Sequence, residues 1–101
     1  MPTPAQDAIK RGFVAHLRVH GETCLFGGKT FLGVLGQLRA DDPRMVGVTD
    51  SVSLLSVLTE ALPSPRPKRG GTIVFAGRDS LRVTQVPRDQ PSGITEFVVA
   101  K

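Results

Sequence analysis

The sequence contains no tryptophan and no tyrosine, and its aromatic residues other than histidine are five phenylalanines. Many nucleic-acid binders stack bases on exposed aromatic rings, so this composition argues against a dedicated base reader. The only cysteine, Cys24, cannot form an intramolecular disulfide. Gly, Arg, Ser or Thr interrupts every apolar run before the roughly 18 residues that a membrane helix requires. We therefore expect no membrane partner.

The first residues, MPTPAQDAIK, also lack the apolar segment of a signal peptide, so we expect a soluble protein that folds in the cytoplasm. A chain of 101 residues with 40% apolar composition predicts a single compact domain over residues 1–101. Lys and Arg outnumber Asp and Glu by 13 to 9, which gives a net charge of +4. This modest excess favours acidic neighbours but defines no nucleic-acid site.

An amphipathic helix is predicted over residues 4–20. Thr3 is a suitable N-cap, Pro4 suits the first helical position, and Gln6 completes a capping box. Gly21 is the expected C-terminal stop.

Apolar side chains recur every four residues along this helix and form one stripe, made up of Ile9, Phe13 and Leu17. The cations that point away from the stripe are Lys10, Arg11 and Arg18. Gly12 costs the helix about 1 kcal/mol relative to Ala, so we expect a marginal helix unless something packs on it.

Residues 22–101 are predicted to be a β-rich core. Strands at 23–26 and 29–38 flank Gly27 and Gly28, and a Gly-Gly pair supplies the positive φ angles of a type I′ hairpin turn. The sequence therefore predicts a β-hairpin.

Regular secondary structure is interrupted or ambiguous at several places between residues 33 and 71. Gly33 and Gly36 within the second hairpin strand suggest a bulge or a bend. Residues 43–50 are predicted to form a loop, and residues 52–62 fit a strand and a helix equally well. Residues 63–71, PSPRPKRGG, should be an exposed basic loop because their prolines continue neither kind of element.

The C-terminal third is predicted to be a meander with one buried face. Leu81 and Val83 should face one way and Arg82 and Thr84 the other. The expected strands are 72–75, 80–86 and 94–100, separated by turns at 76–79 and 87–93 that contain Gly77 and Gly93.

The tripeptide Gly28-Lys29-Thr30 matches the end of a phosphate-binding P-loop. That motif requires another glycine five positions before Gly28, where Thr23 stands, and it must open a helix. The segment FLGVLGQL, with two glycines, follows instead. We interpret Gly27 and Gly28 as the tip of the hairpin, with Lys29 and Thr30 beginning the return strand, and expect no nucleotide cofactor.

Metal binding and nucleophilic catalysis have weak candidates. His16, His20 and Cys24 are spaced by four, but the predicted helix ends before Cys24 and no fourth ligand follows at suitable spacing. No GxSxG motif is present, and both histidines lie on one helix. We predict a non-enzyme without catalytic, metal-binding or cofactor-binding residues.

Two groups of cations could contact phosphates or could equally be solvated: Arg66, Lys68 and Arg69 in the basic loop, and Lys10, Arg11 and Arg18 on the helix. No zinc finger, RNA-binding strand motif or helix-turn-helix accompanies them. Incidental contact with DNA inside a larger assembly is the stronger expectation, and a small basic nucleic-acid-binding module is the alternative.

The order of these elements, together with the ending GGTIVFAGRDSLRVTQVPRDQPSGITEFVVAK, resembles the small head-tail joining proteins of long-tailed bacteriophages, of the lambda type. In that family the C-terminal third reads as a strand, a glycine turn, a short strand with Arg-Val near its end, then an Asp-containing turn before the last strand. The matching residues here are Gly77, Arg82, Val83, Asp89 and Gly93.

The resemblance implies a small antiparallel β-barrel or sandwich with a helix, which joins portal and head-completion proteins to tail proteins as a ring, commonly of six subunits. It implies a monomer in isolation, whose residues 1–3, 43–50 and 63–71 become ordered on assembly. Assembly is expected in the host cytoplasm, and the assembled ring in the virion. The expected contacts are strand edges, the basic loop, and the loop with Arg44 and Met45. A tail-terminator or baseplate component is the alternative.

Overall fold

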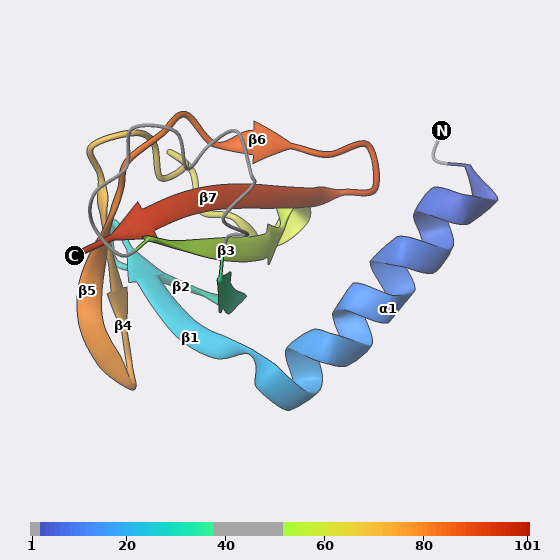
Figure 1. Ribbon diagram of the computed structural model, residues 1–101, viewed down its shortest axis with the longest axis horizontal. Coiled ribbons are helices and arrows are strands. Elements are labelled where there is room, and N and C mark those ends of the chain that lie inside the picture. The colour runs from blue at the N-terminus through green and yellow to red at the C-terminus, as the bar shows by residue number, and fades with distance from the viewer. Residues whose placement is uncertain (1–2, 38–51) are drawn as a thin grey trace.

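The structure is a computed structural model that describes residues 3–37 and 52–101. Its elements are α1 (Pro4–His20), β1 (Glu22–Phe26), β2 (Lys29–Gln37), β3 (Val52–Leu58), the 3₁₀ turn η2 (Thr59–Ala61), β4 (Thr72–Phe75), β5 (Arg78–Val83), β6 (Arg88–Asp89) and β7 (Ile94–Ala100). One N-terminal helix thus precedes a set of antiparallel strands (Figure 1). The predicted fold class, mainly β with one helix, is confirmed.

The strands β1, β2, β3, β7, β5 and β4 pair in that order and close into a barrel, because β4 also pairs with β1. The longest ladder joins β3 to β7, from Val52 opposite Ala100 to Leu58 opposite Ile94, and the two strands lie side by side in Figure 1. The short strand β6 pairs with β7. A closed barrel leaves few exposed strand edges.

The barrel interior is filled by inward-facing side chains from every long strand. The buried core comprises Cys24, Phe31, Leu55, Val57, Ile73, Phe75, Leu81, Val83, Phe97 and Val99. Leu81 and Val83 are buried while Arg82 is exposed, as predicted for β5. On β7 the prediction of one buried face was wrong, because Val98 and Ala100 are also buried and alternate with Phe97 and Val99.

The helix has the predicted capping box. The backbone N–H of Gln6 donates to Thr3 Oγ1 at 3.2 Å, and the N–H of Thr3 donates to Gln6 Oε1 at 2.8 Å. Gly21 ends the helix, but with φ −65° it does not use the left-handed region. A Cβ there would clash with the carbonyl oxygen of Leu17, so glycine is required by this close approach.

The glycines of the first hairpin behave as predicted at the turn but not within the strand. Gly27 and Gly28 have φ angles of 60° and 81°, which confirms the tight turn. The pairing of β2 with β3 runs without a shift from Gly33 opposite Val57 to Gly36 opposite Leu54, so the suggested bulge is absent from this ladder. Gly33 instead makes room for the core side chains of Leu55 and Val57.

Several boundaries in the second half differ from the prediction. The ambiguous segment 52–62 is a strand followed by the 3₁₀ turn. The turn before β5 covers only residues 76–77, because Arg78 already pairs with Phe75, and β5 ends at Val83 instead of residue 86. Gly77 lies in this turn with φ outside the left-handed range. The predicted turn 87–93 contains β6, and its last residue, Gly93, has φ 86°.

Candidate interaction surfaces

The basic loop, residues 63–71, has no regular secondary structure and exposes its cations, as predicted. It is nevertheless anchored to the barrel, because Pro67 is completely buried. Arg66 forms an ion pair with Asp89 on β6, in which the guanidinium Nη1 donates to both carboxylate oxygens, at 3.1 and 2.9 Å. Arg66 is therefore engaged within the chain.

A polar network continues from this ion pair into the barrel wall. Thr95, which is completely buried, donates from its hydroxyl to Asp89 Oδ1 at 2.8 Å and lies 2.7 Å from the hydroxyl oxygen of Thr59. The Arg66 guanidinium, followed by the Thr95 hydroxyl, holds the pKa of the Asp89 carboxyl below its ordinary value. The network links the basic loop to β6, β7 and the start of η2.

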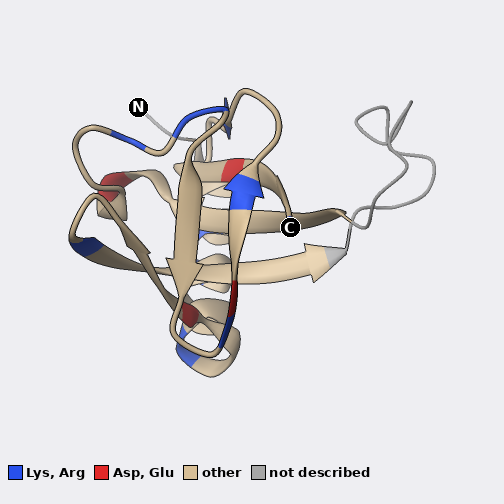
Figure 2. Ribbon diagram, turned by 90° about the vertical axis from the view of Figure 1, so that its left-hand side faces the viewer, with Lys and Arg blue, Asp and Glu red and all other residues tan. Residues whose placement is uncertain are grey.

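The remaining cations of the basic loop have no partner among the described residues. Lys68 and Arg69 make no ion pair with any residue in the described ranges 3–37 and 52–101. Arg82 on β5 is also exposed and free within these ranges, and it lines the same hollow as Arg69. Figure 2, which faces β4 and β5, shows basic segments at the end of β5 and on the loop above it. The sequence prediction placed Arg82 correctly on the outer face but missed this proximity.

Of the three cations predicted to lie on the helix, one forms an ion pair and two do not, within the described residues. Lys10 pairs with Glu60 of η2 at 3.3 Å, and its aliphatic chain would lie within 3.6 Å of a Cβ at Gly93. Arg11 and Arg18 are exposed and have no ion-pair partner in the described part of the chain. Arg44 and Met45, the remaining candidate contacts, lie outside the described residues.

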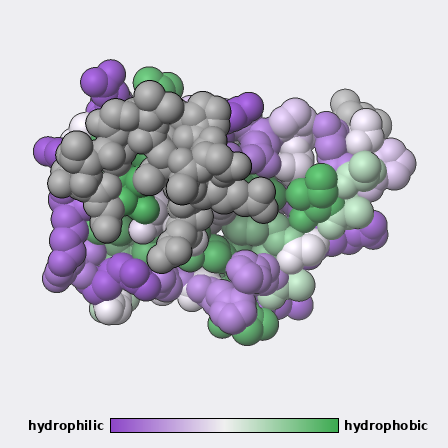
Figure 3. All heavy atoms as spheres, viewed as in Figure 1, coloured by the Kyte–Doolittle hydropathy of each residue, from purple (hydrophilic) through white to green (hydrophobic). Residues whose placement is uncertain are grey.

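The apolar stripe of α1 is covered only at one end. Leu17 is 7% exposed and Phe13 is half-buried, but Ile9 is 56% exposed. Figure 3 shows hydrophobic residues along the side of the helix that faces the barrel, and in Figure 1 the N-terminal half of α1 diverges from the barrel. We call Ile9, Phe13 and Leu17 the helix row.

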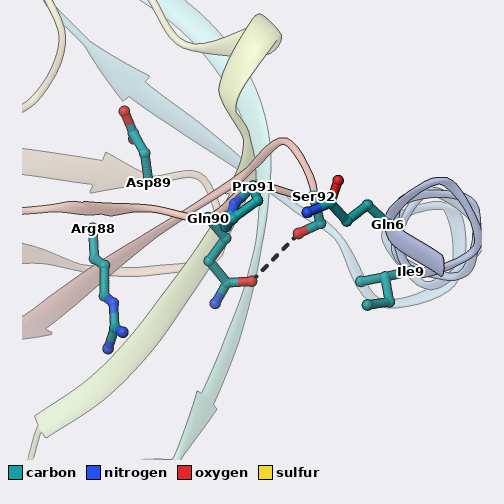
Figure 4. A pocket seen from close by; sticks show the side chains of 7 residues that line it. All are labelled: Gln6, Ile9, Arg88, Asp89, Gln90, Pro91 and Ser92. Atoms are coloured by element: carbon teal, nitrogen blue, oxygen red, sulfur yellow. Dashed lines mark hydrogen bonds between the residues drawn. The ribbon is translucent and has the colours of Figure 1, made fainter. Parts of the chain in front are cut away.

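A hollow of about 440 Å³ separates the exposed end of the helix row from the β6–β7 turn. Ile9 and Gln6 line it from the helix, and Ser92 lines it from the turn, where the Ser92 hydroxyl donates to Gln90 Oε1 at 3.4 Å (Figure 4). The side chains of Arg88 and Asp89 point in opposite directions there, as alternation along β6 requires. The hollow could receive an apolar side chain against Ile9.

A second uncovered apolar surface lies on the outside of the barrel. Leu25 on β1 stands directly opposite Val74 on β4, and Leu32 on β2 is diagonal to Leu25, since Thr30 is the direct partner. Leu25, Leu32 and Val74 are 38%, 46% and 43% exposed. The other outward residues on these strands, Thr23, Thr30, Val34, Gly36 and Thr72, carry no charge. We call Leu25, Leu32 and Val74 the sheet face.

The residues considered for nucleotide, metal or covalent chemistry occupy ordinary structural positions. Lys29 begins strand β2 after the Gly27–Gly28 turn, so the hairpin interpretation is confirmed and no helix follows the tripeptide. Cys24 is completely buried, and burial raises the pKa of its thiol to about 12. His16 and His20 contact each other on the exposed side of α1, with ring centroids 4.7 Å apart.

Two further kinds of feature are absent from the described residues. Residues 3–37 and 52–101 hold no cluster of three or more His, Cys, Asp or Glu side chains that could bind a metal. Among the same residues, no helix has the length and apolarity needed to cross a membrane. Comparison of the chain with protein-family models, curated protein sequences and solved structures found no match.

Proposed function

We propose that this protein is a non-catalytic structural protein of a phage virion, which joins head to tail through ring-forming contacts between copies. One observation carries the proposal: apolar side chains remain exposed at two separate places, at Ile9 on the uncovered end of the helix row and on the sheet face of the barrel. Exposed apolar patches typically mark interaction sites. When two different patches on one chain meet across copies, the contact is heterologous and can close into a ring.

The helix cannot cover the sheet face of its own chain. Only Gly21 separates α1 from β1, so the helix direction is fixed at its C-terminal end. Leu17 is buried against the barrel, and the ion pair between Lys10 and Glu60 holds the middle of the helix near η2. A second copy can supply what the first chain cannot reach. The resemblance to head-tail joining proteins, together with the confirmed fold class, supports placing such a ring between portal and tail proteins.

The test uses one charge-introducing variant on each surface and a matched control. Ile9→Glu alters the helix row, Leu32→Glu alters the sheet face, and Val86→Glu introduces the same charge at an apolar residue that is 76% exposed and lies on neither surface. All three should fold, because the parent side chains are already exposed.

The readout is complementation of the parent phage with its own gene deleted. The wild type and Val86→Glu should restore tailed particles, whereas Ile9→Glu and Leu32→Glu should leave filled heads and separate tails. Normal tailed particles from the deletion strain alone would refute a joining role. If deletion abolishes joining but both surface variants restore it, the role would stand and the two surfaces would be the wrong ones.

A further inference from the structure

Arg69 and Arg82 come from distant parts of the sequence but line one hollow on the outside of the barrel. The hollow has a volume of about 370 Å³, and its remaining walls are Gly70, Val83 and Thr84. Both arginines are exposed, and neither has a hydrogen-bond or ion-pair partner in the described part of the chain. Their guanidinium groups are therefore available to a ligand in this hollow.

Backbone hydrogen bonds fix the positions from which these two side chains extend. The N–H of Gly70 donates to the carbonyl of Val83 at 2.8 Å, and the N–H of Val83 donates to the carbonyl of Gly71 at 2.8 Å. Gly70, with φ 90°, turns the loop onto β5. Arg82 lies within the β5 ladder, opposite Thr72 of β4 and Ala100 of β7. The backbone of both arginines is therefore already held in position, so that binding of a ligand would have to order only their side chains.

The positive charge of this hollow is not neutralised within the described residues. The carboxylates of Glu22, Glu60, Asp79 and Asp89 are paired with Arg78, Lys10, Lys101 and Arg66. Glu96 also has an interaction, and Asp7, which has none, lies at the start of α1. An external anion is therefore the partner that suits Arg69 and Arg82.

The arrangement favours a phosphate over a carboxylate. One arginine satisfies both oxygens of a carboxylate through its planar fork, whereas a phosphate offers oxygens in tetrahedral directions that a second guanidinium can reach. We propose that Arg69 and Arg82 form a binding site for a phosphate group. It could be supplied by a nucleic-acid backbone or by free phosphate, and the site would read no base sequence, since its walls hold no aromatic ring.

The experiment separates the two sources of phosphate. Anisotropy of a fluorescent DNA duplex is measured over a range of salt concentrations for wild type, Arg69→Gln, Arg82→Gln and the double variant. Arg11→Gln is the matched control, because Arg11 is also exposed and free within the described ranges but lies on the helix. In parallel, inorganic phosphate is titrated while backbone amide signals are followed by NMR.

A nucleic-acid site predicts that each hollow variant lowers the slope of log affinity against log salt by about 1 and the double variant by about 2, with no change for Arg11→Gln. A free-phosphate site predicts shifts at Gly70 and Thr84 that saturate and disappear in the double variant, without salt-steep DNA binding. Equal loss in Arg11→Gln and the hollow variants, or binding of neither ligand at low salt, would overturn the proposal. This inference does not depend on the proposed function.

Discussion

Replacing Gly33 with alanine should destabilise the barrel although Gly33 has an ordinary strand conformation. An added Cβ would lie 2.6 Å from Leu55 Cδ1 and 3.1 Å from Val57 Cγ2. Leu55 and Val57 are both completely buried, so neither can move aside without displacing other core residues. Overpacking of this kind costs about 1–3 kcal/mol. For a domain of this size, each kcal/mol lowers the melting temperature by about 4–8 °C.

Gly36 on the same strand provides the matched control, because nothing lies within 4 Å of a Cβ added there. Alanine is favoured over glycine within a strand by about 0.5–1 kcal/mol, so Gly36→Ala should leave stability unchanged or raise it. The two substitutions are thus predicted to act with opposite sign, as measured by urea unfolding and by thermal melting.

A double-mutant cycle tests the named contact. Leu55→Ala alone should cost about 2–5 kcal/mol because it leaves a cavity in the core. In that background Gly33→Ala should cost much less, since Leu55 Cδ1 is gone and only the 3.1 Å approach to Val57 Cγ2 remains. If Gly33→Ala is no more damaging than Gly36→Ala, or costs the same with and without Leu55, the close-approach explanation is wrong.

Three further predictions concern a turn, an ion pair and the thiol. Gly28→Ala, at φ 81°, should cost about 1–2 kcal/mol in urea unfolding, whereas Gly77→Ala should cost little; equal costs would contradict the turn argument. Because the pKa of Asp89 is lowered by folding, its contribution should be present above its ordinary value of 3.8 and disappear as pH falls through the folded pKa. Asp89→Asn should therefore reduce stability at pH 7, by no more than about 1 kcal/mol for an exposed pair, and by progressively less as pH falls through the folded pKa; a pH-independent difference would contradict this. Cys24 should react with a thiol reagent only at the rate set by unfolding, because it is buried and its pKa is about 12; fast labelling of the native protein would show that the barrel opens locally.

The features predicted correctly were those determined by short stretches of sequence. The capping box needs only Thr3 and Gln6, and the hairpin turn needs only Gly27 and Gly28. The alternation of Leu81 and Val83 likewise follows from the two-residue period of a strand. Such features are specified locally, so a single sequence suffices to find them.

The errors arose where contacts between distant residues decide the outcome. Gly33 was interpreted as the site of a bulge or a bend, because its real constraint, Leu55, lies 22 positions away on a strand that the sequence left ambiguous. Arg78 was assigned to a turn, but its two hydrogen bonds to the Glu22 carboxylate, both 2.8 Å, belong to a residue at the start of β1. No local pattern carries this information.

For the candidate contact residues, too, the sequence predicted the local features correctly and missed those that depend on distant residues. Composition alone identified an exposed basic loop, and its cations are exposed. Composition could not indicate that Asp89 engages Arg66, nor that Arg82 lines the same hollow as Arg69, because both depend on how the loop lies across β5 and β6. The sheet face escaped notice for a similar reason, since Leu25, Leu32 and Val74 become neighbours only through strand register.

The most direct test of the central claim, a heterologous contact between copies, is cysteine cross-linking of a mixture. One copy carries Ile9→Cys in the helix row, and a second copy of different mass carries Leu32→Cys in the sheet face. The native Cys24 is buried and should not interfere. Under mild oxidation at high protein concentration, the account predicts that the mixed dimer dominates and that each variant alone cross-links poorly. The account would be contradicted if the yield of homodimers equalled or exceeded the yield expected from random pairing. It would also be contradicted if no cross-linked dimer formed.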